Sequence, residues 1–104
     1  MNATQNYRFA AAGREDLPGL KQMAREIIVA DYASFLGVDA TGEFIASGQA
    51  DRELDEGFER CTVLFVAEVP VGFAIVDRNV LHLLMVDRRH RHRGYGSILL
   101  RHVE

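Results

Sequence analysis

Near its end the chain has ten consecutive positions, Arg88–Ser97, that contain four arginines, two histidines and two glycines. The glycines, Gly94 and Gly96, lead directly into an apolar run whose spacing predicts a helix. Backbone N–H groups at a helix start have no partners within the helix, and the aligned peptide dipoles favour an anion there. Glycines let a phosphate approach the backbone, and Arg91 and Arg93 add positive charge. The segment therefore predicts a binding site for a diphosphate.

This positive charge is local. Residues 1–86 contain seven Lys and Arg against 13 Asp and Glu, a net charge of −6, whereas residues 87–104 contain five Arg against two acids, a net charge of +3. So compact a patch favours one anionic ligand group over a long polyanion, and no nucleic-acid partner is expected. Two other interpretations stay open, a solvated loop or a nucleic-acid contact, although neither explains the glycines or the apolar flanks.

Length and composition limit the class of protein. The 104 residues, 48% apolar and 26% charged, are expected to form one domain over residues 1–104. A single cysteine, Cys61, excludes an internal disulfide, and the sequence has neither a signal-peptide pattern nor an apolar run long enough for a membrane span. We therefore expect a cytoplasmic protein without a membrane partner, and no metal site is predicted.

The first half predicts a strand followed by two helices. Tyr7–Ala11 has the character of a short strand. Asp16 can cap a helix that has Pro18 in its first turn and apolar residues at spacings of three and four, and this helix is expected to end near Ala30. A second helix is expected over about Thr41–Arg60, with ends that its glycines leave open.

The second half predicts three strands and a helix. Thr62–Glu68 and Val71–Val76 are rich in β-branched and aromatic residues and predict a hairpin with its turn at Val69–Pro70. After a further turn, Val80–Val86 is apolar on both faces apart from His82, which predicts a strand buried on both sides. The diphosphate site would then lie between this strand and the last helix, whose apolar residues are expected to anchor it to the sheet: Ile98, Leu99, Leu100 and Val103.

The run from Val86 to Leu100 resembles the acetyl-CoA-binding motif of the GNAT superfamily of N-acetyltransferases. The core of that motif is Arg/Gln-x-x-Gly-x-Gly/Ala, and Arg91, Gly94 and Gly96 fill its three defining positions. The motif becomes much more specific here because a buried strand is expected before it and an apolar helix after it. The order of elements also resembles the amino-terminal half of the family's domain.

The resemblance implies the fold. It is α/β (α+β), a GNAT-like acyl-CoA N-acyltransferase fold with a mixed sheet that begins β-α-α-β-β-β-α. A family domain continues past this helix with a parallel strand, so the single domain is expected to be incomplete at its carboxyl end. Arg88 stands where many members have proline and His92 where many have glycine. Neither departure removes a required amide, so both bear on the shape of the loop more than on binding.

The resemblance also implies a cosubstrate and a reaction. The backbone of the strand before the motif would bind the pantetheine arm of acetyl-CoA, and an N–H near Met85 would polarise the thioester carbonyl. The amides from His92 to Ser97 would hold the pyrophosphate. The acetyl group would pass to a primary amine of a small molecule or peptide. The residues expected to bind acetyl-CoA are Leu84, Met85, Val86, Arg91, His92, Arg93, Gly94, Tyr95, Gly96 and Ser97.

Two side chains are candidates for the catalytic base that takes a proton from the amine. His82 is preferred because histidine titrates near neutrality and some family members carry a similarly placed histidine; the alternative is a structural histidine. Glu68 is the second candidate, and a solvated turn carboxylate is its other interpretation. Tyr32 and Phe35 could line the acceptor cleft or close the core, and Tyr95 is expected to pack at the helix start and shield the phosphate site.

A second function remains open, a non-catalytic CoA-binding or interaction module derived from an acetyltransferase. Assays of acetyl transfer to a panel of amines distinguish the two. If the chain ends at Glu104, the strand Val80–Val86 would be an apolar sheet edge with unpaired backbone groups, which native proteins rarely leave open. A homodimer is therefore expected, joined along this strand and the Gly94–Glu104 helix.

Overall fold

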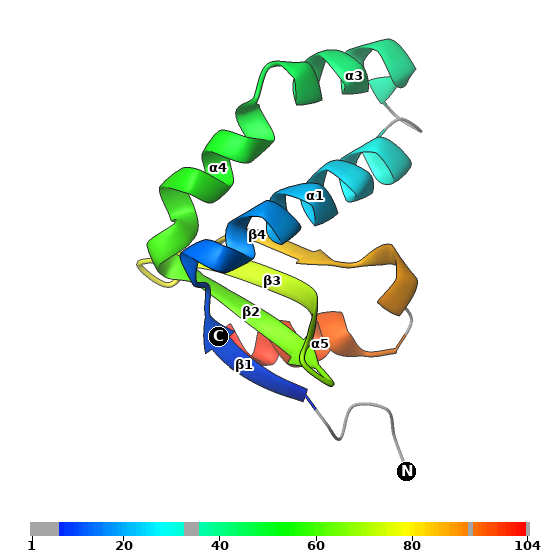
Figure 1. The fold of residues 1–104 in the computed structure, drawn as a ribbon. Helices are drawn as coiled ribbons and strands as arrows, with labels where there is room; N and C mark the ends of the chain where they lie inside the picture. The colour runs from blue at the N-terminus through cyan, green and yellow to red at the C-terminus, as the bar shows by residue number, and fades with distance from the viewer. Residues whose placement is uncertain (1–6, 33–35, 92, 104) are drawn as a thin grey trace. The chain divides into compact units, whose positions relative to one another are not determined.

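The computed structural model describes residues 7–32, 36–91 and 93–103, which fall into two compact units (Figure 1). Residues 1–12 and 59–104 form the first unit, which contains the sheet and the last helix. Residues 13–58 form the second unit, which is helical. None of the helices in the described ranges combines the length and apolar character that crossing a bilayer requires.

The sheet of the first unit has four strands in the order β1-β2-β3-β4, and each neighbouring pair is antiparallel. The strands are β1 (Tyr7–Ala11), β2 (Cys61–Val66), β3 (Val69–Asp77) and β4 (Val80–Val86). The predicted order of elements, β-α-α-β-β-β-α, is confirmed, with the second helix divided into two.

Both hairpin turns consist of two residues with positive φ, the pattern of a type I′ turn. Ala67 and Glu68 have φ of 51° and 65° between β2 and β3, and Arg78 and Asn79 have φ of 54° and 65° between β3 and β4. The first turn was predicted at Val69–Pro70, which is wrong by two residues. Those residues instead begin β3 and pair with Val66 and Phe65, because the Ala67–Glu68 turn already matches the twist of the strands.

The prediction that β4 is buried on both sides is wrong, because the first three residues of the strand are exposed; β4 lies at the edge of the described sheet. Its first residues are open to solvent, with Val80 54% and Leu81 43% exposed, whereas Met85 near its end is buried. Burial increases along the strand because only its last part lies beside α5 and the core. A register shift opposite Ile75 and Val76 leaves His82 as the extra residue of a β-bulge.

Helix α5 (Tyr95–Val103) packs on one face of the sheet, as predicted. Tyr95 and Leu99, both 1% exposed or less, insert into the core. Leu100 is expected to anchor the helix, but it is 40% exposed, because it directly follows the buried Leu99 and so lies on a different side of α5. The buried cluster consists of Leu64, Val71, Ala74, Tyr95 and Leu99, with Phe9, Val66, Leu84, Val86, Ile98 and Val103 packed against it.

The second unit contains α1 (Leu17–Ile27), continued by a π-helical turn over Ile28–Tyr32, and then α3 (Val38–Ala46) and α4 (Gln49–Gly57). Pro18 lies in the first turn of α1 as predicted, but Asp16 does not cap this helix. Its carboxylate instead accepts a hydrogen bond from the Gly13 amide, 2.7 Å away. The single helix predicted over residues 41–60 is wrong, because Gly48 has a left-handed φ of 77° and separates α3 from α4.

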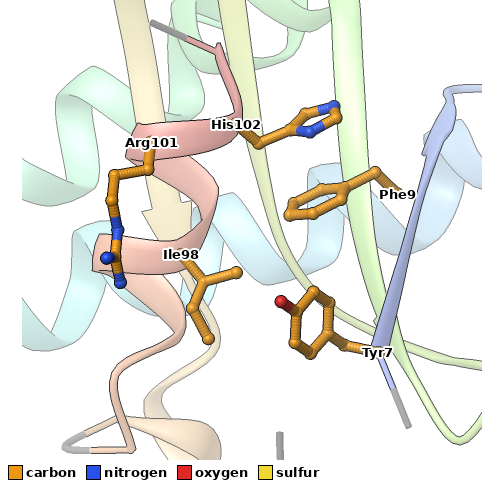
Figure 2. A pocket seen from close by; sticks show the side chains of 5 residues that line it. All are labelled: Tyr7, Phe9, Ile98, Arg101 and His102. Carbon is orange, nitrogen blue, oxygen red and sulfur yellow. The ribbon is translucent and has the colours of Figure 1, made fainter. Parts of the chain in front are cut away.

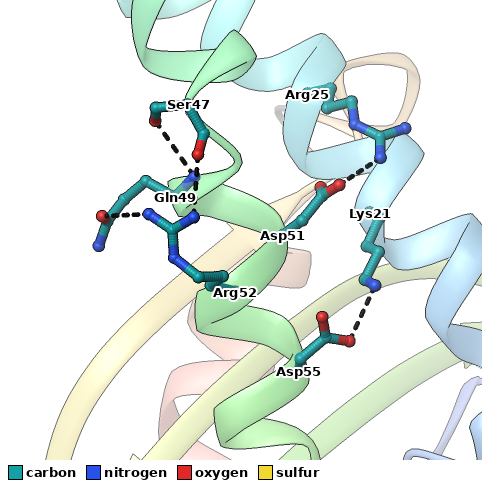
Figure 3. A network of polar contacts seen from close by, with 7 residues as sticks. All are labelled: Lys21, Arg25, Ser47, Gln49, Asp51, Arg52 and Asp55. Atoms are coloured by element: carbon teal, nitrogen blue, oxygen red, sulfur yellow. Dashed lines mark hydrogen bonds and ion pairs between the residues drawn. The ribbon is translucent and has the colours of Figure 1, made fainter.

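Ion pairs join α1 to the acidic side of α4 (Figure 3). Lys21 Nζ lies 2.8 Å from Asp55 Oδ1, and Arg25 pairs with Asp51. Arg52 turns back to donate to the carbonyl of Ser47 at 2.9 Å. Two carboxylates of α4, Asp51 and Asp55, thus form ion pairs with basic side chains of α1.

Candidate functional site

The turn between β4 and α5 begins with Asp87, whose side chain is buried although its neighbours in sequence are basic. The residue is 6% exposed, and its backbone N–H donates to the Val71 carbonyl at 2.8 Å. Its carboxylate accepts from the Arg89 amide at 3.4 Å and so caps the short 3₁₀ turn Arg88–His90. The position of this turn is therefore defined by a side chain and a backbone bond to β3.

The basic side chains of the turn have different surroundings. Arg88, Arg89 and Arg93 are exposed, and Arg89 and the half-buried His90 lie beside Asp87. Arg91 is half-buried, and its Nε donates to the Val86 carbonyl at 3.4 Å. His92, which was expected to contribute an amide, lies outside the described residues. At least one predicted phosphate ligand, Arg91, thus lies against the end of β4.

Gly94 has φ of +82°, a conformation that glycine adopts without strain. Its carbonyl accepts the hydrogen bond of Ile98 N at 3.1 Å, so it stands at the start of α5. The amides of Gly96 and Ser97 precede this bond, in the first turn, where helix geometry provides no acceptor within the helix. Among the described residues, no atom beyond the two chain neighbours lies within 4 Å of the place where a Cβ of Gly94 would be, so, with respect to them, the space beside this glycine is open.

The remaining predicted acetyl-CoA ligands border this turn. Leu84 and Val86 are half-buried and Met85 is buried, all in the last part of the edge strand β4. The Tyr95 side chain is in the core, so the expected packing at the helix start is confirmed. The structure therefore brings the end of β4, the basic turn and the start of α5 together within one unit.

The two candidate bases lie far apart on the sheet. His82 is exposed, at the bulge of β4 opposite Ile75 and Val76, near the end of β3. Glu68 precedes the first residue of β3, in the other hairpin turn. The two side chains are thus separated by most of the length of β3, and the structure does not bring them together.

Glu68 forms an ion pair that lowers its basicity. Arg8 donates two hydrogen bonds to its carboxylate, at 3.0 Å from Nε and 2.8 Å from the terminal nitrogen. These hydrogen bonds and the positive charge of Arg8 hold the pKa of Glu68 below its ordinary value of 4.5. A carboxylate with a lowered pKa accepts a proton less readily near neutral pH.

The aromatic residues suggested for an acceptor cleft are Tyr32 and Phe35. Tyr32 ends the π-helical turn in the helical unit, and Phe35 lies outside the described residues. A different hollow of about 370 Å³ lies between β1 and α5, and Figure 2 shows its lining side chains. There the rings of Phe9 and His102 stack with their centres 3.7 Å apart, and the ring centre of Tyr7 lies 5.7 Å from that of Phe9.

Sequence reasoning missed two residues that shape the site. Asp87 carries a detectable signal, an acidic residue directly between an apolar strand and a basic turn. Gly72 has a weaker sequence signal, because its role depends on contact with another strand. A Cβ at this position would lie 2.8 Å from the Met85 carbonyl oxygen of β4. This glycine lets the end of β4 approach β3 closely.

Comparisons with known proteins agree with this geometry. The model of the Acetyltransferase (GNAT) family matches residues 22–104. A search among curated protein sequences found no significant match.

Solved structures share the fold. The structure of PaiA N-acetyltransferase from Thermoplasma acidophilum in complex with coenzyme A is similar with a TM-score of 0.78 and 19% identity, over 92% of this chain and 68% of that chain. The solution structure of apo YjaB from Escherichia coli has a TM-score of 0.73 and 21% identity, over 93% of this chain and 63% of that chain. The structure of N-acetylglutamate synthase from Neisseria gonorrhoeae, complexed with coenzyme A and N-acetyl-glutamate, is similar with a TM-score of 0.65 and 16% identity. The similarity covers 93% of this chain and 21% of that chain.

The chain thus spans 68%, 63% and 21% of the lengths of these three proteins. Acetyl-CoA as cosubstrate fits the family, in keeping with the Arg91, Gly94 and Gly96 motif. Because the family model covers most of the chain, and the fold and the motif agree with it, the chain belongs to the GNAT family of acetyltransferases.

Proposed function

We propose that this chain binds acetyl-CoA at the turn between β4 and α5 and transfers its acetyl group to a primary amine of a small molecule or peptide. One observation carries the proposal: left-handed Gly94 starts α5 directly after an arginine-rich turn at the end of an edge strand. Family membership supports it, as do the relatives from Thermoplasma acidophilum and Neisseria gonorrhoeae whose structures contain coenzyme A.

The residues present fit a diphosphate. The amides of Gly96 and Ser97 lie in the first turn of α5, where the helix dipole favours an anion. The open space beside Gly94 leaves the backbone accessible to a ligand. Arg91 and Arg93 bring positive charge to the same turn, and His92 would add a further amide.

The end of β4 would hold the pantetheine arm. Leu84, Met85 and Val86 belong to an edge strand, whose outer backbone groups can pair with an extended ligand. When bound, acetyl-CoA supplies a thioester, whose C–S bond is exchanged for a C–N bond to the amine, with release of the CoA thiol. A backbone N–H near Met85 would stabilise the charge that develops on the carbonyl oxygen.

His82 is the proposed base that takes the proton lost by the amine. Its side chain is exposed on the same strand as the proposed thioester site, and the bulge sets it apart from the regular alternation of β4. Histidine suits proton transfer near neutral pH. Glu68 is the weaker candidate, because Arg8 stabilises its ionised form.

Turnover on a panel of primary amines, followed by release of free thiol and by the mass of the product, tests the function. We expect the wild-type protein to acetylate at least one amine. His82→Ala should lower kcat about 100-fold or more and remove an ionisation from the pH profile, with nearly unchanged affinity for acetyl-CoA.

Glu68→Gln is the matched control, and its kcat should stay close to that of the wild type. Equal turnover in wild type and His82→Ala would contradict the role of His82. Binding of CoA without acetylation of any amine would favour the alternative, a non-catalytic CoA-binding or interaction module.

A further inference from the structure

We infer that Asp87 is a positioning residue of the acetyl-CoA site: its buried carboxylate holds the turn that aligns Arg91 and Gly94. This inference rests on the proposed function. Asp87 acts through the Arg88–His90 turn, which lies between β4 and α5.

Three contacts connect Asp87 to the elements on either side. Its amide donates to Val71 of β3 at 2.8 Å, which continues the sheet pairing one residue beyond the end of β4. Its Oδ1 accepts from the Arg89 amide at 3.4 Å, at the start of the 3₁₀ turn. The turn closes with the His90 amide, which donates to the Asp87 carbonyl at 2.9 Å. Both ends of the turn are therefore held by the same residue.

The side chains beyond the turn add to this arrangement. Asp87 Oδ2 lies 3.4 Å from Arg89 and 3.4 Å from His90 Nδ1. His90 Nδ1 is buried and, among the described residues, makes no hydrogen bond, and the nearby carboxylate oxygen of Asp87 is the polar group that faces it. The His90 ring in turn lies 6.4 Å from the ring of Tyr95, which is part of the core. The turn is thus connected to the first residue of α5.

The charges explain why a carboxylate is compatible with an anion site. An isolated carboxylate near a diphosphate would repel it. Here Arg89, and His90 when it is protonated, lie beside Asp87 and compensate its charge. Arg91 and Arg93 follow in sequence, toward Gly94. Arg89 and His90 therefore lie beside Asp87, whereas Arg91 and Arg93 are expected to bind the ligand.

The test compares CoA affinity of Asp87→Ala and Asp87→Asn by isothermal titration calorimetry, at a temperature at which circular dichroism shows both variants folded. Alanine removes the acceptor for the Arg89 amide and should weaken CoA binding about tenfold. Asparagine keeps an acceptor oxygen of the same reach and should stay within about threefold of the wild type. In spectra without ligand, the amide signals of Gly94 and Ser97 should move in Asp87→Ala but stay close to their wild-type positions in Asp87→Asn.

Asp77→Asn is the matched control, because Asp77 ends β3 and pairs at 3.9 Å with Arg60, away from the turn. Its CoA affinity should equal that of the wild type. Wild-type affinity in Asp87→Ala would overturn the inference, as would equal losses in Asp87→Ala and Asp87→Asn. If the wild-type protein itself does not bind CoA, the proposed function fails instead.

Discussion

The two glycines of the motif differ in what their backbone requires. Gly94 has a left-handed φ of +82°, whereas Gly96 lies in the first turn of α5 without a positive φ. A Cβ at Gly96 would lie 3.7 Å from Val86 Cγ2, an ordinary contact. A substitution at Gly96 can therefore change ligand affinity without destabilising the fold, whereas a substitution at Gly94 is expected to affect both.

Gly96→Ala should bind CoA at least tenfold more weakly although the fold is not weakened. The added methyl group would lie beside Val86, at the end of the strand expected to hold acetyl-CoA, while alanine favours the helix by up to about 1 kcal/mol. Thermal unfolding and calorimetric titration measure the two effects. Gly94→Ala, in contrast, should lose about 1–2 kcal/mol of stability because alanine resists a left-handed backbone. Undiminished CoA affinity in Gly96→Ala would count against the site.

At this scale the sequence predicts residues whose roles are local and misses those whose roles depend on distant partners. Arg91, Gly94 and Gly96 are recognisable from their types and spacing, and Gly94 has a left-handed φ, which glycine adopts without strain. The burial of Asp87 depends on Val71, and the ion pair of Glu68 depends on Arg8, sixty positions away. No local pattern predicts such contacts.

Among the elements, β4 determines the site, and its position depends on Gly72 of β3. Gly72 pairs with Val86, and a Cβ there would lie 2.8 Å from the Met85 carbonyl oxygen and 3.5 Å from Val86 Cα. Only glycine allows this approach, so the end of β4 must move if the residue is enlarged.

Gly72→Ala should lower the free energy of unfolding by about 1–3 kcal/mol, because the backbone of β4 cannot yield as a flexible side chain could. CoA affinity should also fall, since Val86 borders the turn. Urea denaturation and calorimetry measure both quantities. Gly42→Ala in α3, where no atom of the described part of the chain lies within 4 Å of the new Cβ, is the control and should not be destabilised. An unchanged denaturation midpoint in Gly72→Ala would show that the strands separate without cost.

The type and order of the elements could be predicted, but their ends and burial could not. Apolar runs predict each strand, but the apolar run of β4 wrongly predicts burial on both faces, because composition does not show which part of a strand other elements cover. Val80 and Leu81 show the difference by their exposure. The helix expected over residues 41–60 breaks at Gly48, since the apolar spacing on either side does not reveal a left-handed residue.

For the whole molecule, we propose a homodimer that meets along β4 and α5. Val80 and Leu81 on β4 are 54% and 43% exposed, and Leu100 on α5 is 40% exposed. Apolar side chains beside an edge strand favour pairing with a second chain. The same edge is the proposed site of the pantetheine arm, so association and acetyl-CoA binding are expected to compete.

Size-exclusion chromatography with light scattering tests this at micromolar concentration. The chain of residues 1–104 should elute with the mass of a dimer, and Leu81→Lys should shift it toward the monomer by placing charge at the edge. Saturating acetyl-CoA should shift it in the same direction. A monomer without ligand, unchanged by Leu81→Lys, would contradict the dimer.

The central claim is that acetyl-CoA binds where β4 ends and α5 begins, and an amide-resolved NMR titration tests it most directly. With ¹⁵N-labelled protein and increasing acetyl-CoA, we expect the largest shifts at Gly94, Gly96 and Ser97, followed by Met85 and Val86. The hollow between β1 and α5, with Phe9 and His102, should respond little. Absent shifts at saturating acetyl-CoA, or shifts confined to that hollow or to residues 13–58, would contradict the claim.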